Sequence, residues 1–131
     1  MHINNMAKLD RRKYARVQIH NCISYSCLDS KNNLLDPNMG FVRNVSQDGV
    51  CIETVCNIKS VYVKLMFIDM QNNHTEMKGK LAYCRKADSG KFKTGIRFKG
   101  TEFENLLFVR KLVKSYHYQK GKPQLVNSGT I

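Results

Sequence analysis

Apolar and polar residues alternate along most of the chain from Val17 onward. A period of two is typical of strands with one buried face. The segments that show it, or a short apolar run, are residues 17–25, 39–45, 50–55, 61–67, 77–83 and 92–98. Short turn-rich stretches separate them, which excludes a βαβ arrangement. The pattern therefore predicts an all-β domain, a closed sandwich or barrel of six antiparallel strands.

Residue types that favour turns mark the connections. The stretch from Asp29 to Asn38 holds Asn32, Asn33 and Pro37, and we expect it to be a loop. The Asp48-Gly49 pair within Ser46–Gly49 predicts a tight hairpin in which glycine supplies a positive φ angle. Asn72-Asn73 and Asp88–Gly90 predict two further turns.

After Gly100 the period changes to that of a helix. Thr101 and Glu104 have the spacing of a capping box, in which each side chain meets an unpaired backbone N–H. One helical stripe is predicted to face the barrel: Leu106, Val109, Val113 and Tyr116. Leu107 and Phe108 lie outside that stripe, and they either cover the barrel edge or contact a partner. The sequence predicts a flexible N-terminus over 1–8, one domain over 9–118 and a flexible tail over 119–131.

Composition narrows the function classes. The 131 residues include 22 Lys and Arg against 10 Asp and Glu, a formal net charge of +12, which favours anionic partners. No apolar stretch has the length of a signal peptide or a membrane span, so we expect a cytoplasmic protein without membrane insertion. The five cysteines are expected to be free thiols. The paired spacings Cys22/Cys27 and Cys51/Cys56 would send side chains to opposite strand faces, so no metal site is expected.

Two short motifs carry the functional prediction. Arg12 and Arg16 form R-x-x-x-R directly before the first strand, and Asn44, Ser46 and Gly49 form N-x-S-x-x-G at a strand end and its hairpin. Each motif alone is also typical of a solvated basic arm or an ordinary turn. Together, in this order, they resemble the two signature motifs of the PilZ family, and the resemblance covers 9–118.

The resemblance implies a six-stranded antiparallel PilZ-type β-barrel with a C-terminal α-helix. It also implies a receptor for cyclic-di-GMP rather than an enzyme, with no cofactor and no catalytic residue. The ligand-binding residues that it implies are Arg12, Arg16, Asn44, Ser46 and Gly49, and we add Arg11, which lies next to Arg12.

The chemistry of these residues suits a guanine dinucleotide. An arginine can donate two parallel hydrogen bonds to guanine O6 and N7, or to a phosphate. Asn44 and Ser46 can accept from the opposite base edge, and they share a strand face because they are two residues apart. Gly49 leaves room for a flat base at the turn. We expect the basic arm to become ordered over the ligand and to signal to a downstream protein partner, with the receptor acting as a monomer or a ligand-linked dimer.

Two other functions stay open at this stage. A PilZ-like adaptor would bind protein without ligand. A basic barrel could bind single-stranded nucleic acid, since residues 78–122 hold thirteen basic side chains against three acidic ones. An enzyme is not expected, because the ten acids are dispersed and no nucleophile or phosphate-loop motif is present.

Overall fold

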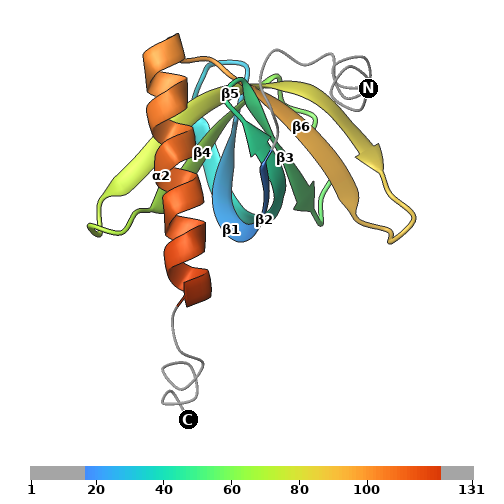
Figure 1. Cartoon of the computed structure of the whole chain (residues 1–131). Coiled ribbons are helices and arrows are strands. Elements are labelled where there is room, and N and C mark those ends of the chain that lie inside the picture. Colours follow the sequence, from blue (N-terminus) through green and yellow to red (C-terminus); the bar gives the residue numbers. More distant parts are fainter. Residues whose placement is uncertain (1–16, 122–131) are drawn as a thin grey trace, which may run out of the picture.

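The computed structural model describes residues 17–121 as a closed barrel with one helix (Figure 1). Its elements are β1 (Val17–Leu28), β2 (Leu34–Ser46), β3 (Gly49–Thr54), β4 (Tyr62–Ile68), β5 (His74–Lys86), β6 (Phe92–Phe98) and α2 (Glu102–Gly121). The strands follow one another around the barrel in the order β1-β2-β3-β6-β5-β4, and every pairing is antiparallel. The predicted six-stranded antiparallel barrel with a C-terminal helix is confirmed.

The alternating residues fill the inside of the barrel. Its most deeply buried apolar side chains come from five of the strands and from α2: Ile19, Ile23, Val42, Val45, Ile52, Val63, Leu65, Ile96 and Leu112. Tyr25 is also inside, and burial raises the pKa of its hydroxyl, with nearby cysteines adding to the effect. These side chains belong to one hydrophobic core cluster, and the outer face of the barrel is built on it.

Two of the hairpins use the same turn, with the sequence D-x-x-N-N. Asp29 and Asp69 each accept two backbone N–H bonds from residues two and four positions later, at 2.8–2.9 Å. The first asparagine of each pair, Asn32 or Asn72, has a positive φ of 68° or 66°, which asparagine tolerates better than most residues. Hydrogen bonds from Asn73 N–H, from Gln71 N–H and from the Thr75 hydroxyl lower the pKa of Asp69, and Lys111 Nζ at 3.9 Å adds to this.

The second strand begins earlier than predicted. Residues 34–38 belong to β2 and pair with the end of β1, so only the short turn before Leu34 is a loop. The prediction failed because these residues are exposed on both faces and therefore show no alternation. Met39 and Phe41 are exposed as well, 60% and 39%, because Gly40 and Val42 are the residues that point inward.

The helix begins as predicted but buries a different face. Thr101 Oγ1 accepts the Glu104 N–H at 3.1 Å, and Glu104 Oε1 accepts the Thr101 N–H at 2.7 Å, so the capping box is confirmed. The most buried face consists of Phe108, Leu112 and Ser115, whereas the predicted stripe is only half-buried beside it.

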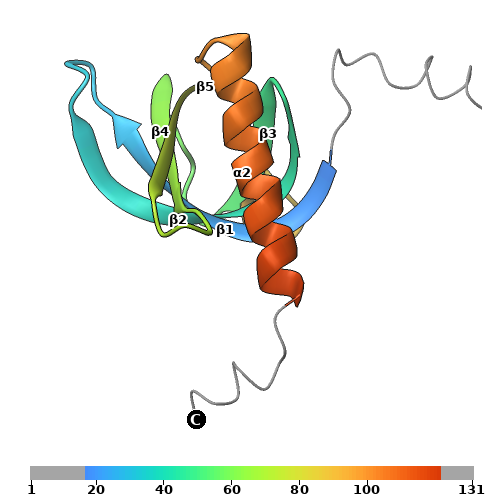
Figure 2. The same ribbon diagram turned by 60° about the vertical axis from the view of Figure 1, so that its left-hand side comes forward.

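Phe108 fixes the position of α2 on the barrel. Its ring meets Phe67 of β4 and Phe98 of β6 edge to face, at centroid distances of 5.3 and 5.4 Å. Figure 2 shows α2 running across the barrel, with β4 and β5 on one side and β3 on the other. Of the two residues outside the predicted stripe, Phe108 covers the barrel, while Leu107 is 42% exposed.

Three further observations concern the described residues. The five cysteines are free thiols. No group of three or more His, Cys, Asp or Glu side chains within 17–121 could hold a metal ion. No helix in this part of the chain combines the length and apolar character that crossing a membrane requires.

Candidate functional site

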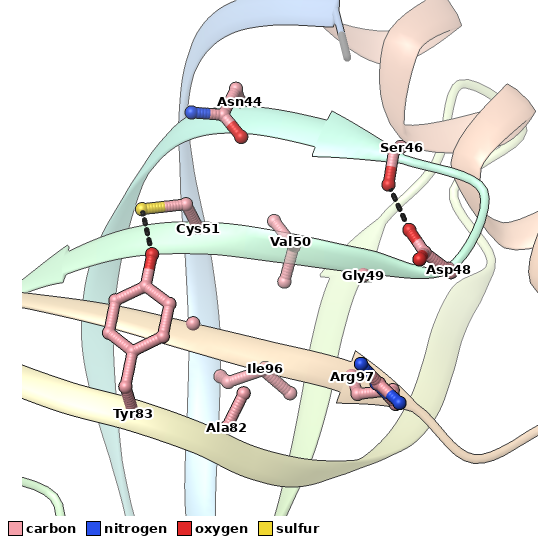
Figure 3. A pocket seen from close by; sticks show the side chains of 11 residues that line it. Asn44, Ser46, Asp48, Gly49, Val50, Cys51, Ala82, Tyr83, Ile96 and Arg97 are labelled. Atoms are coloured by element: carbon pink, nitrogen blue, oxygen red, sulfur yellow. Dashed lines mark hydrogen bonds between the residues drawn. The ribbon is translucent and has the colours of Figure 1, made fainter. Parts of the chain in front are cut away.

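A hollow of about 290 Å³ lies on the outer face of β2, β3, β6 and β5 (Figure 3). Its lining residues come from these four strands and the β2–β3 turn: Asn44, Ser46, Asp48, Gly49, Val50, Cys51, Ala82, Tyr83, Gly95, Ile96 and Arg97. The sequence-predicted residues Asn44, Ser46 and Gly49 are thus brought together in one depression. Its volume is close to the lower limit of the range for small-molecule pockets.

The sheet register explains why the surface is hollow there. One row of paired residues runs across four strands from Asn44 through Cys51 and Gly95 to Tyr83. The middle positions of this row carry a small side chain or none, so they form a floor between the taller Asn44 and Tyr83. A second row of paired residues runs from Ser46 through Gly49 to Arg97. Its middle residue, Gly49, has no side chain, so the surface is low there as well.

Two β-bulges direct the walls of the hollow outward. Between Val42 and Asn44 the register of β2 against β3 shifts by one residue, so that Asn44 faces outward although Val42, two residues earlier, faces the core. A second shift, between Leu81 and Tyr83 of β5, turns Tyr83 out beside Ala82. Bulges of this kind commonly re-aim side chains next to binding sites. The alternation predicted over residues 77–83 would place Tyr83 on the same face as Leu81, and the bulge shows that this is wrong.

Gly49 does not supply the positive φ angle that was predicted for the hairpin turn. The turn consists of Gln47 and Asp48, and Gly49 pairs with Ser46 as the first residue of β3. Positive φ angles among the described residues occur elsewhere, so Gly49 is not required for a left-handed turn conformation. A Cβ added at Gly49 would lie 2.6 Å from the carbonyl oxygen of Ile96. Glycine is needed here because β6 passes very close.

The Ser46 side chain is held by the turn. Its hydroxyl donates a hydrogen bond to Asp48 Oδ1, and Ser46 itself is buried. Donation to a carboxylate leaves the lone pairs of the Ser46 oxygen available to accept and makes that oxygen more electron-rich. Asp48 was missed in the sequence analysis, although its place inside the motif between Ser46 and Gly49 could have indicated it.

Tyr83 and Arg97 complete the hollow from β5 and β6. The Tyr83 ring lies over Gly95, where an added Cβ would come within 2.3 Å of the ring. Its hydroxyl is 3.7 Å from Cys51 Sγ (Figure 3). The Arg85 guanidinium lies over the ring, 4.6 Å from its centroid. Arg97 is exposed at the other end and forms part of the rim of the hollow.

The three arginines of the basic arm, Arg11, Arg12 and Arg16, lie outside the described residues. The point where that arm joins the barrel is described. Val17 pairs with Val45, between Asn44 and Ser46, and Gln18 pairs with Asn44. From Gln18 to Val17, toward the N-terminus of β1, the paired residue on β2 therefore moves from Asn44 to Val45, in the direction of Ser46.

Comparisons with known proteins identify the architecture. No family model and no curated protein matches the chain. Among solved structures, it is similar to the inhibitor of motility MotI/DgrA of Bacillus subtilis, with a TM-score of 0.58 and 11% identity over 86% of this chain. It is similar to the PilZ domain of YcgR from Escherichia coli, solved with c-di-GMP, with a TM-score of 0.57 and 12% identity over 85% of this chain. The K. pneumonia MrkH–c-di-GMP complex matches 79% of it, with a TM-score of 0.55 and 12% identity.

The matched lengths differ between these proteins. The chain covers 95% of the YcgR PilZ domain but only 54% of MotI/DgrA and 50% of MrkH. Identities near one in ten carry information about architecture and not about individual site residues. The shared six-stranded barrel and its closing helix show that this chain has a PilZ-type fold.

Proposed function

We propose that the chain is a non-enzymatic receptor domain for cyclic-di-GMP, which binds in the hollow on β2, β3, β6 and β5. One observation carries the proposal: Asn44, Ser46 and Gly49 line a single depression beside the residue from which the basic arm departs. The fold adds support, because the YcgR PilZ domain and MrkH, which share it, were solved with c-di-GMP.

The described residues supply one side of a guanine site. Asn44 Oδ1 and Ser46 Oγ accept from the N1–H and amino group of the base, and the Ser46 oxygen is suited to this because its own proton goes to Asp48. The flat floor formed by Cys51 and Gly95 admits a planar ring. Asn44 accepts through one carbonyl oxygen, whereas the aspartate that other members of the family carry could accept through two.

The arm supplies the other side. Arg16 precedes the first residue of β1, Val17, by one position, and Arg12 precedes it by five. Since an extended residue spans at most about 3.6 Å, five residues reach at most about 18 Å from the start of β1. Because Val17 and Val45 are paired, their Cα atoms are about 5 Å apart, and all three arginines can reach the hollow. We assign Arg11, Arg12 and Arg16 to the two phosphates and to guanine O6 and N7.

Binding then orders the arm and creates a surface for a protein partner. Three like-charged guanidinium groups repel one another, and two ligand phosphates offset that repulsion. In this proposal the receptor acts in the cytoplasm, where the thiols remain reduced. It binds as a monomer or as a ligand-linked dimer.

Calorimetric titration with cyclic-di-GMP tests the proposal. Removing an arginine that makes charged hydrogen bonds weakens binding by about 10- to 150-fold, so Arg12→Ala should bind far more weakly than wild type. Ser46→Ala should lose about tenfold. The matched controls are Arg110→Ala on the exposed face of α2 and Ser30→Ala in the β1–β2 turn, which should both bind as wild type does.

Cyclic-di-AMP, whose base lacks the guanine O6 and 2-amino groups, should bind at least tenfold more weakly than cyclic-di-GMP. Equal binding of cyclic-di-GMP by wild type, Arg12→Ala and Ser46→Ala would refute the assignment of the site.

A further inference from the structure

Cations face cations across the outer surface of β4, β5 and β6. Three pairs of directly opposed residues within the described strands are both basic: Lys64 with Lys78, Lys80 with Arg97, and Arg85 with Lys93. Like charges in directly opposed positions destabilise a sheet. This surface, defined by these six residues and called the cationic face below, is therefore electrostatically unfavourable in the isolated domain.

Carboxylates of the described residues neutralise the basic side chains of the cationic face only in part. Lys64 Nζ is 2.7 Å from Glu76 Oε1, so one pair is partly offset. Glu53 is paired with Lys93 in the sheet, but its carboxylate contacts Arg43 at 2.8 Å and Lys91 at 3.8 Å. No carboxylate of the described residues lies within 4 Å of Lys80 or Arg97.

The cationic face is larger than a cyclic dinucleotide requires. From Lys78 to Arg85 it extends over seven residue steps of β5, or about 23 Å at a strand rise of about 3.3 Å per residue. Cyclic-di-GMP carries two phosphate charges, whereas six basic side chains line this length. The excess indicates a longer anion with regularly repeated charges.

Aromatic rings lie among these cations. Lys78 Nζ is 4.7 Å from the centroid of the Tyr62 ring, and the Arg85 guanidinium is 4.6 Å from that of Tyr83. Tyr62 is also paired with Lys80, and Tyr83 is paired with Gly95, so the two rings lie on neighbouring strands among the basic residues of the face. Rings interleaved with cations are the combination that binds single strands, with bases on the rings and phosphates on the charges.

The apolar residues favour the same class of ligand. The exposed large apolar side chains of the described residues lie on β2, β4, α2 and connecting turns, and none lies on β5 or β6. A protein partner would need apolar anchors at the centre of its interface, and a membrane surface would favour apolar residues that insert. The cationic face offers no such apolar residue on β5 or β6.

We propose that the cationic face binds single-stranded nucleic acid without sequence preference, over about four nucleotides. The backbone phosphates lie along Lys78, Lys80, Arg85 and Lys93, and bases stack on Tyr62 and Tyr83 after the covering cations move to adjacent phosphates. Since Tyr83 and Arg97 also line the hollow, cyclic-di-GMP and the strand compete. The binding itself does not depend on the proposed receptor function.

Fluorescence anisotropy with a labelled oligothymidylate of twelve nucleotides tests this inference. With four phosphate contacts, the association constant falls about 50-fold between 50 and 200 mM salt, because its logarithm changes by about −0.7 per contact for each logarithmic unit of salt. Lys80→Gln/Lys93→Gln should bind about 25-fold more weakly at 0.1 M salt. These substitutions remove repulsion, so the variant should fold at least as stably as wild type.

Two further variants test where the oligonucleotide binds and which class of anion the face prefers. Arg110→Gln/Lys114→Gln, which removes the same charge from exposed positions of α2, should lose less than threefold. Tyr62→Leu should weaken oligothymidylate binding at least fivefold and should leave the binding of a labelled peptide of twelve glutamates unchanged.

Three results would overturn the proposal. One is the absence of oligothymidylate binding at 50 mM salt. Another is an equal loss in the α2 control variant. The third is a glutamate peptide that binds as tightly as the oligonucleotide, which would mark the face as a site for acidic proteins. None of these results bears on the titration with cyclic-di-GMP, which tests the proposed receptor function separately.

Discussion

Replacing Gly49 with alanine tests whether this motif residue is required by the fold itself. A Cβ at position 49 would lie 2.6 Å from the Ile96 carbonyl oxygen, and ordinary contact begins near 3.4 Å. The carbonyl oxygen is a backbone atom and the Cβ is bonded directly to the backbone, so neither can rotate away. The strands β3 and β6 must therefore separate by about 0.8 Å at the edge of the hollow. Overpacking of this kind costs about 1–3 kcal/mol. We expect Gly49→Ala to lower the free energy of unfolding by about 2 kcal/mol without any ligand present.

Urea unfolding followed by circular dichroism measures this change. With a slope of about 1.5 kcal/mol per molar urea, a loss of 2 kcal/mol lowers the midpoint by about 1.3 M. Gly40→Ala is the matched control, because its Cβ would meet the Ile52 Cδ1 at 3.0 Å, and that methyl group ends a side chain that can rotate away. A Gly49→Ala midpoint equal to that of wild type would refute the packing argument and would return Gly49 to a role in ligand contact alone.

Three further predictions concern the helix and its contacts. Thr101→Ala removes the capping hydrogen bond to the Glu104 N–H and should cost about 1 kcal/mol in urea unfolding; no change would contradict the capping role. Phe108→Ala should cost about 3–5 kcal/mol, since its ring is buried between two others, and a loss below 1 kcal/mol would show that α2 does not depend on it. Asp69 has a folded pKa below its unfolded value, so its contribution is present above about pH 4 and is lost as the pH falls through the folded pKa. The stability difference between wild type and Asp69→Asn should therefore be larger at pH 7 than at pH 3, and an equal difference at both would contradict this.

The alternation of apolar residues predicts the barrel well where a strand has one buried face. It succeeds for β6, in which Thr94, Ile96 and Phe98 are buried in turn. It fails at the start of β2, where residues 34–38 are exposed on both faces and only the pairing with β1 makes them a strand. It also fails at Tyr83, because a bulge changes the phase without any signal in the local pattern.

The candidate site could be predicted only in part for a related reason. Asn44 and Ser46 are found from their motif, and their spacing of two correctly places them on one face. Tyr83, Cys51 and Gly95 join them through register across four strands, and register is a property of the folded sheet. The helix face was misplaced because Leu106 and Phe108 are equally apolar, and only packing against Phe67 and Phe98 selects Phe108.

Chemical-shift mapping of the amide groups during titration with cyclic-di-GMP is the most direct test of where the ligand binds. We predict that the amides of residues 44–51, Gly95 and Arg97 shift with a single saturable dependence on ligand concentration. Those of the Asp29–Asn33 turn should remain in place. Saturable shifts confined to other elements, with residues 44–51 unaffected, would contradict the proposed site.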